Sequence, residues 1–235
     1  MGGILDDMAQ NIRKIQEKAA AAAASCGRTA GQIALVAISK TFPAEAILQA
    51  AEAGLQRFGE NRVQEAEGKI LSLRRTLNLE WHLVGHLQSN KAKRAVELFD
   101  VIQSLDSVKL ASRISQAAVE MRKRQSVLLQ VDLGQEETKF GADPEQVREI
   151  LEAVPTLKGI RVDGLMTIPP FFEDPEMSRP FYARLRELRD ALDSEQPGCL
   201  GQKHLSMGMS HDFVEAIREG ATIIRVGTAI FGSRQ

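Results

Sequence analysis

Short apolar runs alternate along the chain with longer stretches in which apolar and charged residues are mixed. The first run, residues 33–38, contains six apolar residues and leads into Ser39 and Lys40, and Pro43 follows shortly after. A short apolar run that is bounded by a turn signal is typical of a strand buried on both faces, as in parallel sheets. The pattern therefore predicts a buried first strand with Lys40 at its carboxyl end.

Seven further runs predict strands, at residues 57–61, 80–87, 101–106, 126–133, 160–167, 204–208 and 222–230. Predicted helices separate nearly all of them, at residues 44–53, 62–77, 90–98, 107–124, 144–154, 178–192 and 212–219, and another helix precedes the first strand at residues 4–24. Strands that alternate with helices predict a parallel sheet, and eight such units in a chain of this length favour a closed (β/α)8 TIM barrel.

The alternative is an open sheet of the flavodoxin or Rossmann type. No G-x-G-x-x-G pattern follows the first strand, and no P-loop pattern is present. No Pro-, Gly- or Ser-rich linker divides the chain either. We therefore expect one α/β barrel domain over residues 1–235, with an extra amino-terminal helix.

Composition narrows the class of protein further. The net charge is −1, which gives no indication of a nucleic-acid or membrane partner. Cys26 and Cys199 lie far apart without a metal-ligand spacing, so we expect neither a disulfide framework nor a metal site. No apolar segment is long enough to span a bilayer, and the amino terminus does not have the pattern of a signal peptide. We expect a cytoplasmic protein.

Polar residues gather at the predicted strand ends, which meet at one mouth of a barrel, where active sites lie. A lysine amine that is partly withdrawn from water loses some preference for its proton and becomes a nucleophile toward aldehydes. Lys40 is a candidate for this role, although it could equally extend its amine into water. The other polar residues in this set are Glu60, Asn61, His82, His86, Ser104, Asp106, Asp132, Thr167, Ser206 and Arg225.

The ends of the last two strands suggest an anion site. Ser206 and Gly208 precede a predicted helix, and Gly227 and Thr228 follow Arg225. Glycine-rich loops expose backbone N–H groups to anions, and barrels commonly bind phosphate after strands seven and eight. The alternative is that the glycines only form turns and that Ser210 caps a helix.

A phosphate site together with a strand-end lysine suggests a phosphorylated aldehyde, and pyridoxal 5′-phosphate (PLP) fits this description. Arg225 would face the pyridine nitrogen of PLP. A permanent cation keeps that nitrogen unprotonated, which makes the ring a poor electron sink and suits carriage or limited proton chemistry. A barrel that uses a Schiff-base lysine without a cofactor remains possible from these residues.

Seven segments in chain order resemble motifs of the PLP homeostasis protein family; they are residues 37–41, 58–65, 81–91, 138–141, 164–167, 205–210 and 225–232. The resemblance implies an alanine racemase-type barrel with PLP held as an aldimine on Lys40. It also implies that Ser206, Gly227 and Thr228 hold the phosphate. By the same resemblance, Arg225 faces the pyridine nitrogen, and Asn61 and His82 lie beside the ring. His211 departs from the family pattern, in which we expect an acidic residue.

The same resemblance implies a protein that binds PLP and acts in vitamin B6 homeostasis without an established reaction. We expect a monomer that carries or regulates PLP and hands it to apo-enzymes, without strong catalysis. The alternative is a racemase-like enzyme that acts on amino acids. Such an enzyme needs acid/base groups on opposite faces of the cofactor, one of them usually a tyrosine from a second domain. The single tyrosine, Tyr182, lies in a predicted outer helix. We therefore expect no catalytic residue.

Overall fold

The computed structural model describes residues 2–134 and 140–232 of the chain. Within them, parallel strands β1 to β8 pair in sequence order, and β8 returns to β1, so the barrel is closed. This confirms the predicted (β/α)8 fold and excludes an open sheet. The strands are β1 (Ala34–Ile38), β2 (Arg57–Glu60), β3 (Glu80–Leu83), β4 (Val101–Leu105), β5 (Gln125–Gln130), β6 (Ile160–Met166), β7 (His204–Ser206) and β8 (Ile223–Val226).

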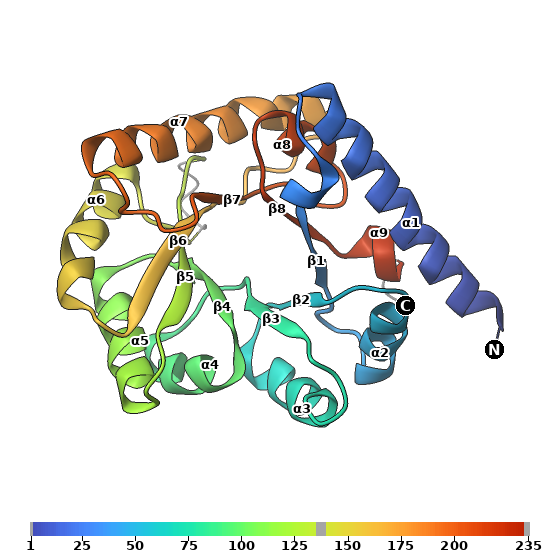
Figure 1. The fold of residues 1–235 in the computed structure, drawn as a ribbon, viewed down its shortest axis with the longest axis horizontal. Helices are drawn as coiled ribbons and strands as arrows, with labels where there is room; N and C mark the ends of the chain where they lie inside the picture. Colours follow the sequence, from blue (N-terminus) through green and yellow to red (C-terminus); the bar gives the residue numbers. More distant parts are fainter. Residues whose placement is uncertain (1, 135–139, 233–235) are drawn as a thin grey trace.

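A helix follows each strand, and the helices form a ring around the barrel (Figure 1). They are α2 (Ala44–Glu52), α3 (Val63–Leu73), α4 (Ala92–Leu98), α5 (Val108–Glu120), α6 (Pro144–Ala153), α7 (Arg179–Glu195), α8 (Phe213–Arg218) and α9 (Thr228–Phe231). The last of these corrects a prediction, because the final strand was expected to reach residue 230. Instead β8 ends at Val226, and the N–H groups of Ile230 and Phe231 turn back to the Gly227 carbonyl.

The predicted amino-terminal helix is present as α1 (Gly2–Ser25). It lies along the outside of the barrel beside α8 and α9 (Figure 1). Alanine, the strongest helix former, fills its second half, and one face buries Ile12, Ile15 and Ala23. The Asn11 amide also donates to the Ile230 carbonyl at 3.4 Å, so α1 supports the segment that follows β8.

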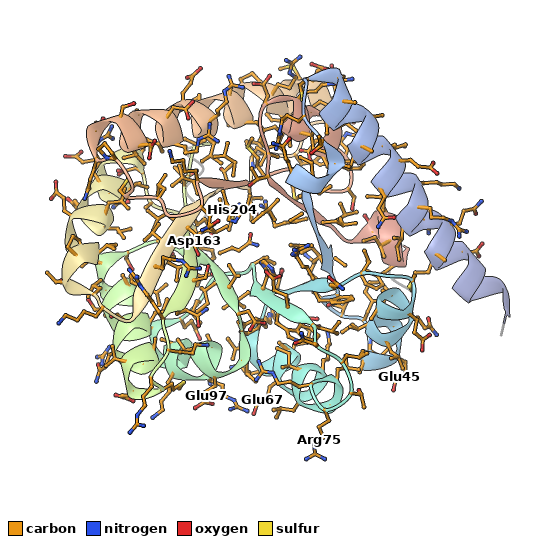
Figure 2. The ribbon with its side chains drawn as sticks, in the orientation of Figure 1. Glu45, Glu67, Arg75, Glu97, Asp163 and His204 are labelled. Carbon is orange, nitrogen blue, oxygen red and sulfur yellow. The ribbon has the colours of Figure 1, made fainter. Side chains whose placement is uncertain are left out.

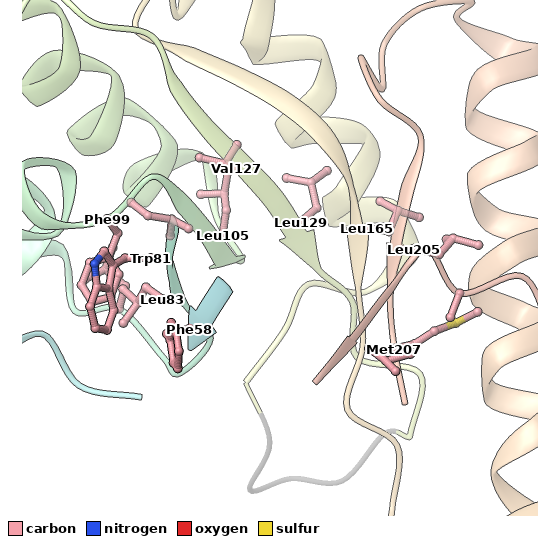
Figure 3. Close-up of a cluster of buried hydrophobic side chains, with 14 of the residues drawn as sticks. Phe58, Trp81, Leu83, Phe99, Leu105, Val127, Leu129, Leu165, Leu205 and Met207 are labelled. Carbon is pink, nitrogen blue, oxygen red and sulfur yellow. The ribbon is translucent and has the colours of Figure 1, made fainter. Parts of the chain in front are cut away.

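Two apolar cores result from the alternation of side chains along each strand. The larger one lies between strands and helices and includes Phe58, Trp81, Leu129, Leu165 and Leu205 (Figure 3). The smaller one lies inside the barrel and contains Val36, Leu128, Met166 and Ile223. Four apolar side chains do not fill a barrel interior by themselves. Ala34, Ile38 and Val101 pack against them, and the buried polar side chains of Gln103, Ser206 and Arg225 also lie in the interior.

In the part of the chain that the structure describes, no helix is long and apolar enough to cross a membrane.

Candidate functional site

Lys40 lies just beyond β1, on the side of the strand that faces the barrel interior. Val36 belongs to the inner core, Ile38 packs against it, and alternation directs Lys40 the same way. The Ser39 N–H still pairs with the Gly59 carbonyl at 3.0 Å, so the strand geometry continues to the residue before the lysine. Thr41 then adopts a left-handed conformation with φ of 70°. Lys40 is therefore a half-buried residue just beyond the carboxyl end of β1, where the sequence predicted it to lie.

The backbone around Lys40 is held by a group of charged and polar residues that we call the Glu60 cluster. It is formed by Ser39, Thr41, Glu60, Glu65 and Lys69. The Ser39 hydroxyl donates to Glu60 at 2.7 Å, and the Lys69 amine donates to Glu60 at 2.9 Å and to the Ser39 carbonyl at 3.0 Å. The Thr41 N–H donates to Glu65, which also accepts from Lys69. These bonds hold both neighbours of Lys40 in place.

Glu60 was expected among the polar groups of the mouth, but the structure directs it outward to α3. Its side chain is fully buried, and this burial raises its pKa despite the Ser39 and Lys69 bonds. Lys69 was not predicted from the sequence. The only local signal was its spacing of four residues from Glu65, which is typical of a helical ion pair and says nothing about Lys40.

Arg225 is the most buried cation near the mouth, with only 4% of its surface exposed. Its Nη1 donates to the Ser206 hydroxyl at 2.7 Å, and its Nη2 donates to the Thr167 carbonyl at 2.8 Å. Among the described residues, no carboxylate forms an ion pair with it. Burial lowers the pKa of Arg225 to about 10, so the guanidinium remains charged at neutral pH. Two of its five N–H groups bond to these neutral oxygens, which leaves donors for a ligand.

Ser206 lies in the barrel interior rather than beside the loop after β8. Its hydroxyl is fully buried and donates to the Gln103 side-chain oxygen at 2.6 Å. The Gln103 nitrogen lies 2.8 Å from Nδ1 of His82, and Nε2 of His82 lies 3.0 Å from Glu80. Both ring nitrogens of His82 therefore have protein partners below the mouth. Gln103 was not predicted from the sequence, because no local pattern within its strand distinguishes it.

The hydroxyl beside the loop after β8 belongs to Ser210. It accepts from the N–H groups of Gly227 at 3.2 Å and Ala229 at 3.4 Å. Gly208 brings the chain to this position with φ of 90°, and a Cβ there would lie 2.5 Å from Ala216. A Cβ on Gly227 would lie 3.3 Å from the Ile38 carbonyl, so this loop packs against the end of β1. The sequence predicts a phosphate cradle at this loop, and the structure places Ser210, rather than Ser206, against its amides.

Three other expected residues line the rim of the mouth or lie close to it. Asn61 follows β2, and its backbone packs so tightly under Gly85 that a Cβ there would lie 2.3 Å from the Asn61 carbonyl oxygen. His86 stacks on Phe140 with ring centroids 3.8 Å apart and lies 3.4 Å from Asp106. Thr228 begins α9 directly after the Gly227 loop.

Tyr182 is a structural residue of α7, as the sequence suggested. It is fully buried, and its hydroxyl donates to Asp212 at 2.7 Å. Burial, followed by the nearby Asp212 charge, raises the pKa of Tyr182. Asp212 also accepts from the Met209 N–H at 2.7 Å, so the pair anchors the loop that carries Ser210. His211 faces outward, with Nε2 2.9 Å from the Glu173 carbonyl oxygen, and its departure from the expected acidic residue leaves this anchor intact.

A second polar region lies at the amino-terminal end of the barrel, around a cavity of about 330 Å3. Asp163 and His204, which Figure 2 labels, line it together with Glu80 and His82. Arg161 pairs with Asp163 at 2.6 Å, and burial lowers the pKa of His204. Barrel chemistry lies at the opposite end, so we assign this region to stability.

The candidate site combines three chemical groups on the adjoining ends of neighbouring strands. β1 pairs with β8 in the register Val36 to Arg225, so Lys40 and Gly227 follow adjacent strands. They bring together an amine, a set of amides with a hydroxyl, and a buried cation. Such a site can form a reversible bond to a carbonyl group while it holds an anion.

Comparison with known proteins gives concordant results. The family model described as alanine racemase, N-terminal domain matches residues 4–235. The pyridoxal phosphate homeostasis protein of Aquifex aeolicus is 45% identical over 226 residues, which is 96% of this chain and 98% of that protein.

Solved structures agree with these matches. PipY of Synechococcus elongatus, solved with PLP bound, is 39% identical and covers 96% of this chain and 100% of its own, with a TM-score of 0.84. Alanine racemase of Clostridium difficile 630 shares the fold with a TM-score of 0.70 at 17% identity, and the match covers 97% of this chain but 57% of the racemase. The chain therefore belongs to the pyridoxal phosphate homeostasis protein family, whose barrel is that of the alanine racemase N-terminal domain.

Proposed function

We propose that this protein binds PLP at the mouth of its barrel and acts in PLP homeostasis as a carrier or regulator. The observation that carries the proposal is the buried, charged Arg225, which bonds only to neutral oxygens while a lysine and an amide cradle lie on the adjoining strand ends. Relatives named for PLP homeostasis, and PipY with its bound PLP, support the choice of ligand.

The residues present fit the chemical groups of PLP. We assign the phosphate to the loop formed by Ser210, Gly227 and Thr228, where its oxygens would replace the Ser210 hydroxyl as acceptors for the Gly227 and Ala229 N–H groups. This revises the expectation that Ser206 holds the phosphate. When bound, PLP supplies an aldehyde that captures amines reversibly, and Lys40 holds the nearest amine that the strand geometry directs inward.

Arg225 donates its remaining N–H groups toward the pyridine nitrogen in this proposal. A permanent cation leaves that nitrogen unprotonated, which disfavours carbanion chemistry and favours carriage. Ser206 supports Arg225 from below, and Asn61 lies at the rim. His82 is not a ligand contact in this assignment, since both of its ring nitrogens have protein partners.

The racemase-like alternative is disfavoured by Tyr182, which donates to Asp212 within the fold rather than at the mouth. We therefore propose a monomeric cytoplasmic protein that hands PLP to apo-enzymes from an accessible mouth. Racemisation of alanine at about 10 per second, an ordinary enzymatic rate, would overturn this assignment.

The test is an absorption spectrum of the purified protein with PLP, before and after borohydride, followed by peptide mapping. We expect a stable reduced adduct on Lys40. Lys40→Ala should abolish the adduct while its circular dichroism remains that of the wild type. Lys93→Ala, which removes an exposed lysine, is the control and should retain the adduct. A protein that takes up no PLP, or an adduct on another lysine, would contradict the proposal.

A further inference from the structure

A line of buried polar side chains runs through the barrel from Arg225 toward its amino-terminal end. We propose that Gln103 and His82 are positioning residues, which fix the orientation of the Arg225 guanidinium. They do so through a series of hydrogen bonds from Arg225 through Ser206, Gln103 and His82 to Glu80, in which each residue donates to the next. This inference rests on the proposed function in so far as Arg225 contacts PLP. The hydrogen bonds themselves join only protein groups and do not depend on PLP. In order from Arg225 to Glu80, the four successive bonds are 2.7, 2.6, 2.8 and 3.0 Å long.

The direction of the chain follows first from Ser206. A guanidinium only donates, so the Ser206 oxygen accepts from Arg225. The single hydroxyl proton of Ser206 then needs an acceptor, and the Gln103 side-chain oxygen lies 2.6 Å away. If the Gln103 amide were flipped, its NH2 group would face a hydroxyl that is fully buried and would leave the serine proton without this acceptor. Buried donors are rarely left unpaired, so the oxygen of Gln103 faces Ser206.

The bond directions at the other end follow from this orientation of Gln103. With its oxygen on Ser206, Gln103 donates an N–H to Nδ1 of His82, which must then be unprotonated. The proton of a neutral His82 therefore lies on Nε2, which donates to Glu80 at 3.0 Å. In the opposite tautomer, a lone pair on Nε2 would face this carboxylate. The His82 bond is also the main cause of a lowered pKa for Glu80, which Arg57 contacts at 3.0 Å.

The chain thus links a buried cation to a carboxylate through three neutral side chains. Every member donates toward Glu80, so the bond dipoles align and strengthen one another. Gln103 has no exposed surface, and rotating its amide would break the bonds on both sides at once. The consequence at the mouth is a guanidinium with one fixed direction, whose unused N–H groups point to one place.

The first test uses the apo protein, so it does not depend on PLP. Nitrogen-15 NMR at about pH 8, above the titration range of an ordinary imidazole, should show His82 as the Nε2-protonated tautomer. Ser206→Ala removes the group that orients Gln103 and should give a mixture of tautomers. Gln103→Met should shift the side-chain N–H signals of Arg225. A wild-type His82 protonated on Nδ1 would overturn the proposal.

The second test measures PLP binding by spectrophotometric titration. Gln103→Met should weaken binding about tenfold, because it disorders a charged donor, and should shift the absorbance maximum of bound PLP. The matched control is Gln125→Met. Gln125 is also a buried glutamine, but it donates to the Asp100 carbonyl and takes no part in the hydrogen-bond series from Arg225 to Glu80.

Equal affinities and spectra for these two variants would refute the positioning role. If the wild type took up no PLP, the proposed function would fail, and the apo NMR signals of Arg225 in the two variants would still decide the role of Gln103.

Discussion

Two groups of buried charge flank the mouth of the barrel, and they are built differently. In the Glu60 cluster, a fully buried carboxylate meets the Lys69 amine at 2.9 Å, and both also bond to the backbone or hydroxyl groups around Lys40. Arg225 is just as buried, but its partners are a hydroxyl and a carbonyl. The Glu60 cluster contains its own ion pairs, whereas Arg225 forms none among the described residues.

This difference distinguishes a group that supports the backbone, the Glu60 cluster, from a group that is available to bind a ligand, Arg225. A buried ion pair whose bonds are all satisfied within the protein has little to offer a ligand, and it serves to hold the segment on either side of Lys40. A buried cation that forms no ion pair has a desolvation cost that the nearby Asp212 charge offsets only in part, and a ligand with a lone pair or negative charge can relieve the remainder. Cations of this kind cluster at functional sites.

Lys69→Met should have the largest effect on stability. It leaves Glu60 buried without its cation, so the carboxyl either remains charged in an apolar site or must take up a proton. We expect the free energy of unfolding to fall by about 3 kcal/mol, as measured by chemical denaturation. Lys93→Met, which breaks an exposed ion pair with Glu120, should change it by less than about 0.5 kcal/mol. Equal losses in both variants would mean that the Glu60 cluster is not a structural anchor.

Arg225→Leu should have a small effect on stability and a large effect on PLP binding. The variant loses bonds to neutral groups but also the cost of burying a charge, so we expect the unfolding free energy to change by less than about 1.5 kcal/mol. PLP binding should weaken about tenfold or more, because a charged donor is lost. Denaturation and PLP titration of the same preparation check both parts. A loss of stability as large as that of Lys69→Met would remove the distinction between the two groups.

Glu60→Gln sharpens the comparison through pH. Because burial raises the folded-state pKa of Glu60 above its ordinary 4.5, the folded protein binds this proton more tightly than the unfolded chain does. The wild type should therefore lose stability relative to Glu60→Gln as the pH rises from 4.5 through the raised pKa, and the difference should be constant below 4.5. Denaturation curves for both proteins across this range give the sign. A wild type that gains stability relative to the variant in this window would contradict the assignment.

Local pattern was enough to predict the barrel, because strand and helix periodicities depend on neighbouring residues in the chain. The apolar run before Lys40 and the Gly227–Thr228 pair predicted an amine and an anion site at the ends of the first and last strands, and closure of the barrel brings β1 beside β8. Even the structural role of Tyr182 followed from its place in an outer helix.

Tertiary structure alone decided which polar side chain faces which partner. Ser206 and Ser210 are alike in sequence, but closure of the barrel directs one to Gln103 and Arg225 and the other to the Gly227 loop. The roles of Lys69 and Gln103 likewise depend on residues distant in the chain. The physical reason is that periodicity selects a face for each side chain, whereas a hydrogen bond requires two groups within about 3 Å, and only the packed chain sets that distance.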